Sequence, residues 1–295
     1  MIATASTPGA LDLVREGEAR LGAAGIEAPR VEAEWLLAGA VGGGRYDAYL
    51  EPARQLGPDG VARYRDLLAR RAAHEPLQYL VGFEDFHGHR LVVTPDVLIP
   101  RPETEGLVEW AVQVLAPHAA PRAADVGTGS GAIACALASR LPGVRVLATD
   151  RSPAALAVAS DNVARLGLGD RIGLLAGDLL APVGRGILDV VVANPPYIAS
   201  AAIASLPLEV RGFEPRAALD GGPDGLTVLR RLVAEAPAAL GQGGWLIMEI
   251  GEDQAGAMAA ILGAAGFDRI EVRRDLRGAE RYIAGQWTRP ARRTC

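Results

Sequence analysis

The chain has 295 residues, a length that suits one large domain with a smaller one better than a single small domain. Its formal net charge of −5 offers no general attraction to a phosphate backbone, and no run of basic residues provides a local one. The composition therefore argues against a stable nucleic-acid partner.

Cysteine usage and apolar stretches narrow the class of protein further. The cysteines, Cys135 and Cys295, lie far apart without metal-ligand spacing, which predicts neither a disulfide framework nor a metal site. Residues 1–4 lack the basic and apolar segments of a leader, and no uninterrupted apolar stretch approaches the roughly 18 residues of a membrane span. We expect an untargeted, soluble, cytoplasmic protein with no membrane partner. The sequence does not determine the oligomeric state, for which a monomer is the default expectation.

Apolar residues recur at helical spacing in the N-terminal part of the chain. Turns that contain Gly and Pro separate them. Between Pro8 and His74 they are Leu11, Val14, Leu21, Trp35 to Leu37, Val61, Tyr64, Leu67 and Leu68. We predict a small helical domain over residues 1–76.

The pattern changes after residue 76. Two short β-like runs, Tyr79 to Val81 and Leu91 to Thr94, flank the turn-forming sequence His87-Gly88-His89. We predict a β-hairpin linker over residues 77–99.

After Pro102 the sequence alternates helical segments, such as residues 152–166 and 226–240, with short runs rich in Val, Ile and Leu. The runs lie at residues 123–126, 144–149, 172–175, 188–193, 245–250, 269–272 and 282–286. This βαβ rhythm predicts an α/β domain over residues 100–295 with a mostly parallel seven-stranded sheet. Ligands of such sheets bind at the carboxyl ends of the strands, where we expect the functional motifs to cluster.

A glycine-rich segment lies where the first of these runs gives way to a helix beginning near Ala132. It reads Asp125-Val126-Gly127-Thr128-Gly129-Ser130-Gly131. Glycine permits a tight turn and a close approach of the backbone to a ligand, although a turn without a ligand would have the same sequence. Asp150 ends the next run, 19 residues after Gly131, where a carboxylate accepts both hydroxyl hydrogens of a ribose. A helix cap is the alternative for Asp150. Together, the loop and Asp150 predict an adenosine-containing cofactor.

The glycine spacing distinguishes between cofactors. A dinucleotide site has Gly-x-Gly-x-x-Gly, whereas this loop has Gly-x-Gly-x-Gly after Asp125 and resembles the first motif of class I methyltransferases. In that family the loop packs around the methionine part of S-adenosyl-L-methionine, and a nearby acidic residue suits the ammonium group. The corner Gly177-Asp178-Leu179 corresponds to the region beside the adenine. Asp178 would accept from the adenine amino group and Leu179 would cover a ring face, with an ordinary polar turn as the alternative.

The tetrapeptide Asn194-Pro195-Pro196-Tyr197 follows the run ending at Ala193, on the same predicted rim as the glycine loop. Its two prolines fix φ and remove two backbone donors, which leaves a stiff corner rich in carbonyls. The Asn194 side-chain carbonyl and the Pro195 backbone carbonyl can each accept one hydrogen of an NH2 group, while Tyr197 lies against a flat amide. We predict methylation of a planar nitrogen, with Asn194, Pro195 and Tyr197 as catalytic residues and Pro196 in the substrate site. A rigid Pro-Pro turn is the alternative.

With these motifs in place, the chain resembles the PrmC/HemK family, the glutamine N(5)-methyltransferases of peptide chain release factors. The resemblance covers nearly the whole chain. Beyond the two motifs it includes Glu75 to Leu80, Gly82, Phe86, Leu98 to Glu105, Asp275-Leu276 and Glu280-Arg281. The family often has an aromatic residue where this chain has Leu179.

The resemblance implies a helical N-terminal domain that helps to recognise the release factor, a β-hairpin connection, and a class I (Rossmann-like) methyltransferase domain. The implied substrate is the Gln in the Gly-Gly-Gln loop of class 1 peptide chain release factors. By position, Gly127 to Gly131, Asp150, Leu179 and Asn194 would contact the cofactor, and Asn194 to Tyr197 the substrate Gln.

Two alternatives keep the chemistry and change the substrate. One is a glutamine of a ribosomal protein, as in a paralogous family. The other is an exocyclic adenine nitrogen in DNA or RNA, against which the acidic charge and the segment from Leu98 to Glu105 argue. A nicotinamide oxidoreductase would need the other glycine spacing, and a non-catalytic binding module would have no use for Asn194.

Overall fold

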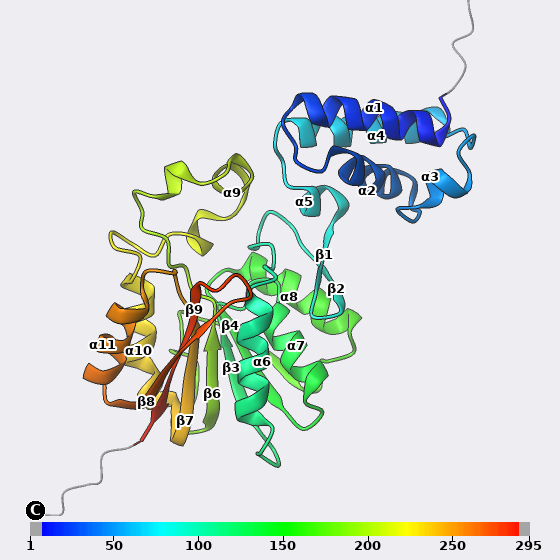
Figure 1. Cartoon of the computed structure of the whole chain (residues 1–295). Coiled ribbons are helices and arrows are strands. Elements are labelled where there is room, and N and C mark those ends of the chain that lie inside the picture. Colours follow the sequence, from blue (N-terminus) through cyan, green and yellow to red (C-terminus); the bar gives the residue numbers. More distant parts are fainter. Residues whose placement is uncertain (1–7, 289–295) are drawn as a thin grey trace, which may run out of the picture. The chain divides into compact units, whose positions relative to one another are not determined.

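A computed structural model describes residues 8–288, which divide into two compact units (Figure 1). The helical unit comprises residues 8–83 together with Pro207–Phe213, and the sheet unit comprises residues 84–206 and 214–288. Residues 1–4, Cys295 and the outer ends of the predicted 1–76 and 100–295 domains lie outside the described residues. Within residues 8–288, no helix is long and apolar enough to cross a membrane.

The helical unit confirms the helices predicted for the N-terminal part of the fold. They are α1 (Ala10–Ala23), α2 (Pro29–Val41), α3 (Asp47–Leu50), α4 (Pro58–Ala72) and α5 (Leu77–Val81). Proline occupies the first turn of α2 and α4, where its missing N–H costs no helical hydrogen bond. Leucines of α1, α2 and α4 form the core around Tyr64, whose hydroxyl donates to the Leu13 carbonyl at 2.9 Å.

A segment from far along the chain completes this unit. The short helix α9 (Leu208–Phe213) brings in Glu209, whose carboxylate accepts from Arg71 at 3.3 Å and contacts Nδ1 of His74 at 2.8 Å. Arg71 is only 6% exposed and also pairs with Glu32 of α2. These partners are what a nearly buried charge requires.

The connection between helices and sheet corrects one sequence prediction. The run predicted as β-like at Tyr79 to Val81 is helical and lies in α5, between Pro76 and the left-handed Gly82 (φ 84°). Three apolar residues fit a helical turn as well as a strand, and here the flanking Pro and Gly decide.

The hairpin itself is confirmed, with strands β1 (Phe83–Phe86) and β2 (His89–Val92). His87 and Gly88 between them have φ values of 51° and 78°, the pattern of a two-residue type I′ turn. The first strand therefore begins four residues later than the predicted run at Tyr79.

The sheet unit confirms the mostly parallel seven-stranded sheet. Each strand overlaps one predicted run, and the strand order is β5-β4-β3-β6-β7-β9-β8. Pairing is parallel from β5 through β7, whereas β9 runs antiparallel to β7 and β8. The strands are β3 (Arg122–Val126), β4 (Arg145–Asp150), β5 (Ile172–Ala176), β6 (Leu188–Ala193), β7 (Leu240–Glu249), β8 (Phe267–Arg274) and β9 (Glu280–Trp287).

Helices cover both faces of this sheet (Figure 1). One face packs against α6 (Thr104–Leu115), α7 (Ala132–Arg140) and α8 (Pro153–Arg165), and the other against α10 (Thr227–Ala239) and α11 (Ala255–Ala264). Along β6, Val190 and Val192 join the first core while Val191 and Ala193 join the second. A strand with both faces buried reads as a continuous apolar run, which is why the sequence reveals it.

The order of the strands creates a crevice at β3. This strand pairs with β4 on one side and with β6 on the other. The connection after β3 contains α7 and the connection after β6 contains α10, so the two connections lie on opposite faces of the sheet. The carboxyl ends of β3, β4 and β6 meet at this switch point, the usual ligand site of an open α/β sheet.

Gly17 tests the packing of the helical unit. A Cβ added there would lie 2.1 Å from the Tyr64 hydroxyl oxygen and 2.8 Å from the Ala33 Cβ. We expect Gly17→Ala to lower the free energy of unfolding by about 1–3 kcal/mol in denaturant titration, because overpacking outweighs the gain in helix propensity. Gly22→Ala in the same helix is the matched control, since its added Cβ would have no neighbour closer than 3.8 Å. Equal losses in the two variants would contradict this packing account.

Candidate active site

A cavity of about 230 Å³ lies along the carboxyl ends of β3, β4, β5 and β6, within the sheet unit. Eight of the residues predicted from the sequence line it: Gly127, Gly129, Asp150, Asp178, Leu179, Asn194, Pro195 and Pro196. Thr128, Ser130, Gly131 and Tyr197 adjoin them in the chain and do not themselves line it. The fold therefore brings the glycine loop, the acidic residues and the tetrapeptide to one place.

The glycine loop depends on glycine for its backbone conformation. Gly127, Gly129 and Gly131 have φ values of 72°, 54° and 81°, a region that residues with a Cβ rarely adopt. A Cβ at Gly127 or Gly129 would meet no protein atom within 4 Å, so it is conformation rather than protein packing that demands glycine there.

Asp125 holds the loop from behind. It is fully buried, and its Oδ2 accepts from the Thr128 hydroxyl at 2.6 Å and from the Ala134 amide at 3.0 Å. Burial raises the pKa of Asp125 to about 7. Asp125 does not line the cavity, and its Oδ2 ties the loop to the first turn of α7.

Asp150 lies at the end of β4 with both carboxylate oxygens fixed. Oδ2 accepts from the Gly129 amide at 3.0 Å, and Oδ1 accepts from the Ser152 amide at 2.9 Å. A carboxylate oxygen has more than one acceptor site, so each retains capacity for a ligand hydroxyl. The cap-like bond to Ser152 and a role toward a ribose are therefore compatible.

Asp178 and Leu179 occupy the corner after β5. The Asp178 carboxylate pairs with Arg231 of α10 at 2.6 Å, and about half of each side chain is exposed. Leu179 has a φ of 49°, a strained value for a residue with a Cβ, and its carbonyl accepts from the Thr149 hydroxyl at 3.0 Å. The corner is thus a specific conformation that directs Leu179 to the cavity wall.

The tetrapeptide begins a chain of hydrogen bonds that leads to the buried Glu249. Nδ2 of Asn194 donates to Oγ1 of Thr104 at 3.0 Å, and that hydroxyl donates to Oε2 of Glu249 at 2.8 Å. The Tyr197 hydroxyl donates to Oε1 of Glu249 at 3.2 Å. Glu249 is 2% exposed, and burial raises its pKa against the opposing effect of Arg281 and the two hydroxyl donors.

Sequence reasoning missed Thr104 and Glu249 as members of the site. Thr104 lies in the Leu98 to Glu105 segment, which stood out through the family resemblance and not for any chemical role. For Glu249 the signal was present, because a carboxylate inside the apolar run from Trp245 to Ile250 is rarely buried without a partner.

Two other segments of the cavity wall were also missed. Asp96, Val97 and Leu98 line one part of it, and Pro215, Ala217, Ala218 and Asp220 line another. An ion pair joins the bases of the two segments, since Nη2 of Arg101 donates to both carboxylate oxygens of the buried Glu214 at 2.6 and 2.7 Å. Residues 215–220 carry no motif that sequence reasoning alone recognises as a ligand contact.

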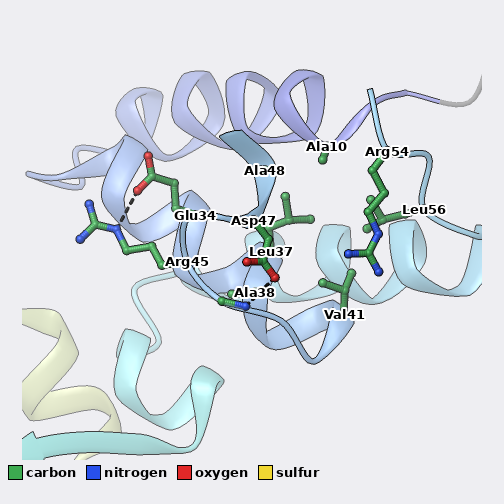
Figure 2. Close-up of a pocket in the computed structure, with 11 residues that line it drawn as sticks. Ala10, Glu34, Leu37, Ala38, Val41, Arg45, Asp47, Ala48, Arg54 and Leu56 are labelled. Atoms are coloured by element: carbon green, nitrogen blue, oxygen red, sulfur yellow. Dashed lines mark hydrogen bonds and ion pairs between the residues drawn. The ribbon is translucent and has the colours of Figure 1, made fainter. Parts of the chain in front are cut away.

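A second hollow, of about 20 Å³, lies in the helical unit, and Glu34 and Arg45 are among the residues that line it (Figure 2). Nε of Arg45 donates to Glu34 at 2.7 Å, and Leu37, Val41 and Leu56 contribute apolar walls. This volume is close to that of a single water molecule, so the hollow is too small for a cofactor. Among residues 8–288, no group of three or more His, Cys, Asp or Glu residues is arranged to hold a metal ion.

Known proteins resemble this chain in both of its parts. Residues 12–82 match the family model of the PrmC N-terminal domain, and residues 108–206 match that of the methyltransferase small domain. A release factor glutamine methyltransferase of Geobacter sulfurreducens is 45% identical over 262 residues, which cover 89% of this chain and 91% of the relative. One of Moorella thermoacetica is 50% identical over 258 residues, which cover 86% of this chain and 90% of the relative.

A solved structure shares the fold. The crystal structure of the hMettl16 catalytic domain in complex with MAT2A 3′UTR hairpin 6 has a TM-score of 0.58 and 22% sequence identity, with 76% of this chain and 82% of that chain covered. At this identity the likeness concerns the fold alone.

Asp125 makes stability depend on pH. Its pKa is raised from the ordinary 3.8 to about 7, so the folded protein holds the proton more tightly than the unfolded chain does. The resulting contribution to the free energy of unfolding is fully present below pH 3.8 and is lost as pH rises through 7. Asp125→Asn removes this titration. We expect the wild type to lose roughly 4 kcal/mol of unfolding free energy relative to Asp125→Asn between pH 4 and pH 8. Denaturant titrations at the two pH values measure it, and parallel pH curves for the two proteins would contradict the buried titration.

Proposed function

The chain belongs to the family of release factor glutamine methyltransferases, and we propose that it transfers the methyl group of S-adenosyl-L-methionine to a release-factor glutamine. The acceptor in this proposal is the side-chain amide nitrogen of the Gln in the Gly-Gly-Gln motif of class 1 peptide chain release factors. One observation carries the proposal: the glycine loop and the Asn194-Pro195-Pro196 corner line the same cavity.

The residues around the cavity fit S-adenosyl-L-methionine. Asp150 has free acceptor capacity for the two ribose hydroxyls, and the loop from Gly127 to Gly131 offers a close-fitting backbone for the methionine part. Within this loop Thr128, Ser130 and Gly131 do not line the cavity, and the Thr128 hydroxyl anchors the loop by donating to Asp125. Asp178 and Leu179 would border the adenine, with Arg231 orienting the Asp178 carboxylate.

The tetrapeptide would hold the substrate amide. Oδ1 of Asn194 and the carbonyl of Pro195 each accept one hydrogen of the glutamine NH2 group, while Pro196 and the ring of Tyr197 border its flat face. An amide nitrogen is a weak nucleophile because its lone pair is delocalised. Fixed acceptors on both hydrogens favour the pyramidal nitrogen of the transition state, and alignment at roughly 3–3.5 Å supplies much of the acceleration.

The bound cofactor supplies an electrophilic methyl carbon on a sulfonium sulfur. A carbon–nitrogen bond forms as the carbon–sulfur bond breaks, and the sulfur keeps the electron pair. The methylated nitrogen then loses one proton to water by way of the Pro195 carbonyl. The proposal needs no strong general base, because the nitrogen becomes acidic only as it gains the methyl group.

The proposal assigns separate tasks to the parts of the chain. Residues 1–76 take part in recognising the release factor, residues 77–99 connect, and residues 100–295 carry out methyl transfer. The match of residues 12–82 to the PrmC N-terminal domain supports the first assignment. Neither nucleic acid nor membrane is a partner in this proposal, and the enzyme works as a cytoplasmic monomer, where release factors act.

Substrate identity is tested with labelled S-adenosyl-L-methionine. The full chain is incubated with a purified class 1 release factor, with its Gly-Gly-Gln variant carrying Gln→Ala, with ribosomal protein, or with DNA and RNA. We expect label only in the Gln-containing release factor, because the relatives of this chain are named release factor glutamine methyltransferases. Label in ribosomal protein or nucleic acid, and none in the release factor, would overturn the assignment.

Asn194 is tested by separating rate from cofactor affinity. We expect Asn194→Ala to lower the single-turnover rate of methyl transfer by about 10²- to 10³-fold, because one of two fixed acceptors is lost. The dissociation constant for S-adenosyl-L-methionine, measured by calorimetric titration, should change by less than about threefold. Ser205→Ala, an exposed change in the segment that follows the tetrapeptide, is the control. Equal losses of rate and affinity would refute the proposed role.

A further inference from the structure

Three elements of the sheet unit meet at a chain of hydrogen bonds. Thr104 begins α6, Glu249 ends β7, and Asn194 follows β6, so their contacts join residues 90 and 145 positions apart. Thr104 and Glu249 are 4% and 2% exposed. The bond between Thr104 and Glu249 is therefore shielded from water, and its donor and acceptor must satisfy one another.

Donor and acceptor capacity fixes the direction of every bond in this chain. An ionised Glu249 has no hydrogen to give, so the Thr104 and Tyr197 hydroxyls must donate to it. The single hydroxyl hydrogen of Thr104 is then used, and its oxygen can only accept from Asn194. The Asn194 amide must therefore present its NH2 group to Thr104. Its carbonyl oxygen Oδ1 is left for the cavity that Asn194 lines.

We propose that Thr104 and Glu249 are positioning residues that hold the Asn194 amide in the one orientation able to accept a hydrogen bond from the substrate nitrogen. This inference rests on the proposed function. A substrate NH2 group offers hydrogens only, so a reversed Asn194 would oppose donors to donors and lose one of the two acceptors that activate the nitrogen. The oxygen and nitrogen of an amide have nearly the same shape, which is why a hydrogen-bond partner is needed to tell them apart.

The charge on Glu249 sets the direction of the chain. A protonated Glu249 can donate to Thr104, which frees the Thr104 hydrogen for Oδ1 of Asn194 and reverses the amide. The charged and titratable groups facing Glu249 are Arg281 and Tyr282 of β9, Tyr197 of the tetrapeptide, and Glu103 ahead of α6. Burial and Glu103 raise the pKa of Glu249, whereas Arg281 and the two hydroxyl donors oppose the rise. Methyl transfer should therefore decline as pH falls and Glu249 is protonated.

Thr104→Val tests the orientation, because valine keeps the shape of threonine and removes the hydroxyl. With a class 1 release factor as substrate, we expect the single-turnover rate of the full chain to fall about 10- to 100-fold, since the Asn194 amide is no longer held. The dissociation constant for S-adenosyl-L-methionine should stay within about threefold of wild type. Thr104→Ser, which restores the hydroxyl, should recover most of the rate. A rate in Thr104→Val within threefold of wild type, or a parallel loss of cofactor affinity, would overturn the proposal.

Glu249→Gln provides a second test that does not depend on the folding of Thr104→Val, because an uncharged isostere is well suited to a buried position. We expect the wild-type single-turnover rate to decline in acid and the Glu249→Gln rate to show no such decline. Identical pH profiles of the two proteins would overturn the role of the carboxylate. Absence of release-factor labelling by the wild type itself refutes the proposed function instead, so the two failures are distinct.

Discussion

The parallel pairing of β3 with both β4 and β6 is the constraint on which the site depends. It gathers the carboxyl ends of three strands at one switch point, so the residues that follow each strand share a single cavity. The glycine loop follows β3, Asp150 ends β4, and Asn194 follows β6. A crossover to a different neighbour would separate these groups while leaving each local sequence unchanged.

Three carboxylates around this switch point have different tasks because their surroundings differ. Asp125 is fully buried, has a raised pKa, and holds the glycine loop from behind. Asp150 reaches the cavity with both oxygens aimed by backbone amides. Glu249 is buried under two hydroxyl donors and governs the orientation proposed for Asn194. Residue type alone does not distinguish the tasks of the three carboxylates. The burial of each carboxylate and the donors around its oxygens do.

The proposed chemistry suits a site made of acceptors rather than bases. A glutamine amide needs alignment and support for its hydrogens more than it needs deprotonation, and the restricted backbone of Pro195-Pro196 limits how far the Pro195 carbonyl can turn. Contacts between residues distant in sequence hold these groups in place. Thr104 stabilises Asn194 across 90 residues, and Arg101 with Glu214 joins two segments of the cavity wall across 113 residues.

The sequence by itself determined the seven-stranded sheet, the glycine loop, Asp150 and the tetrapeptide, because apolar periodicity, glycine spacing and consecutive prolines are local properties of the chain. It did not determine the helix α5, because a short apolar run fits a strand as well as a helix, and the flanking Pro76 and Gly82 decide between them. Only the tertiary structure decided that Asp125 is buried behind the glycine loop and that Thr104 and Glu249 contact Asn194 and Tyr197. Those contacts join strands and helices distant in sequence, and their geometry exists only once the sheet has formed.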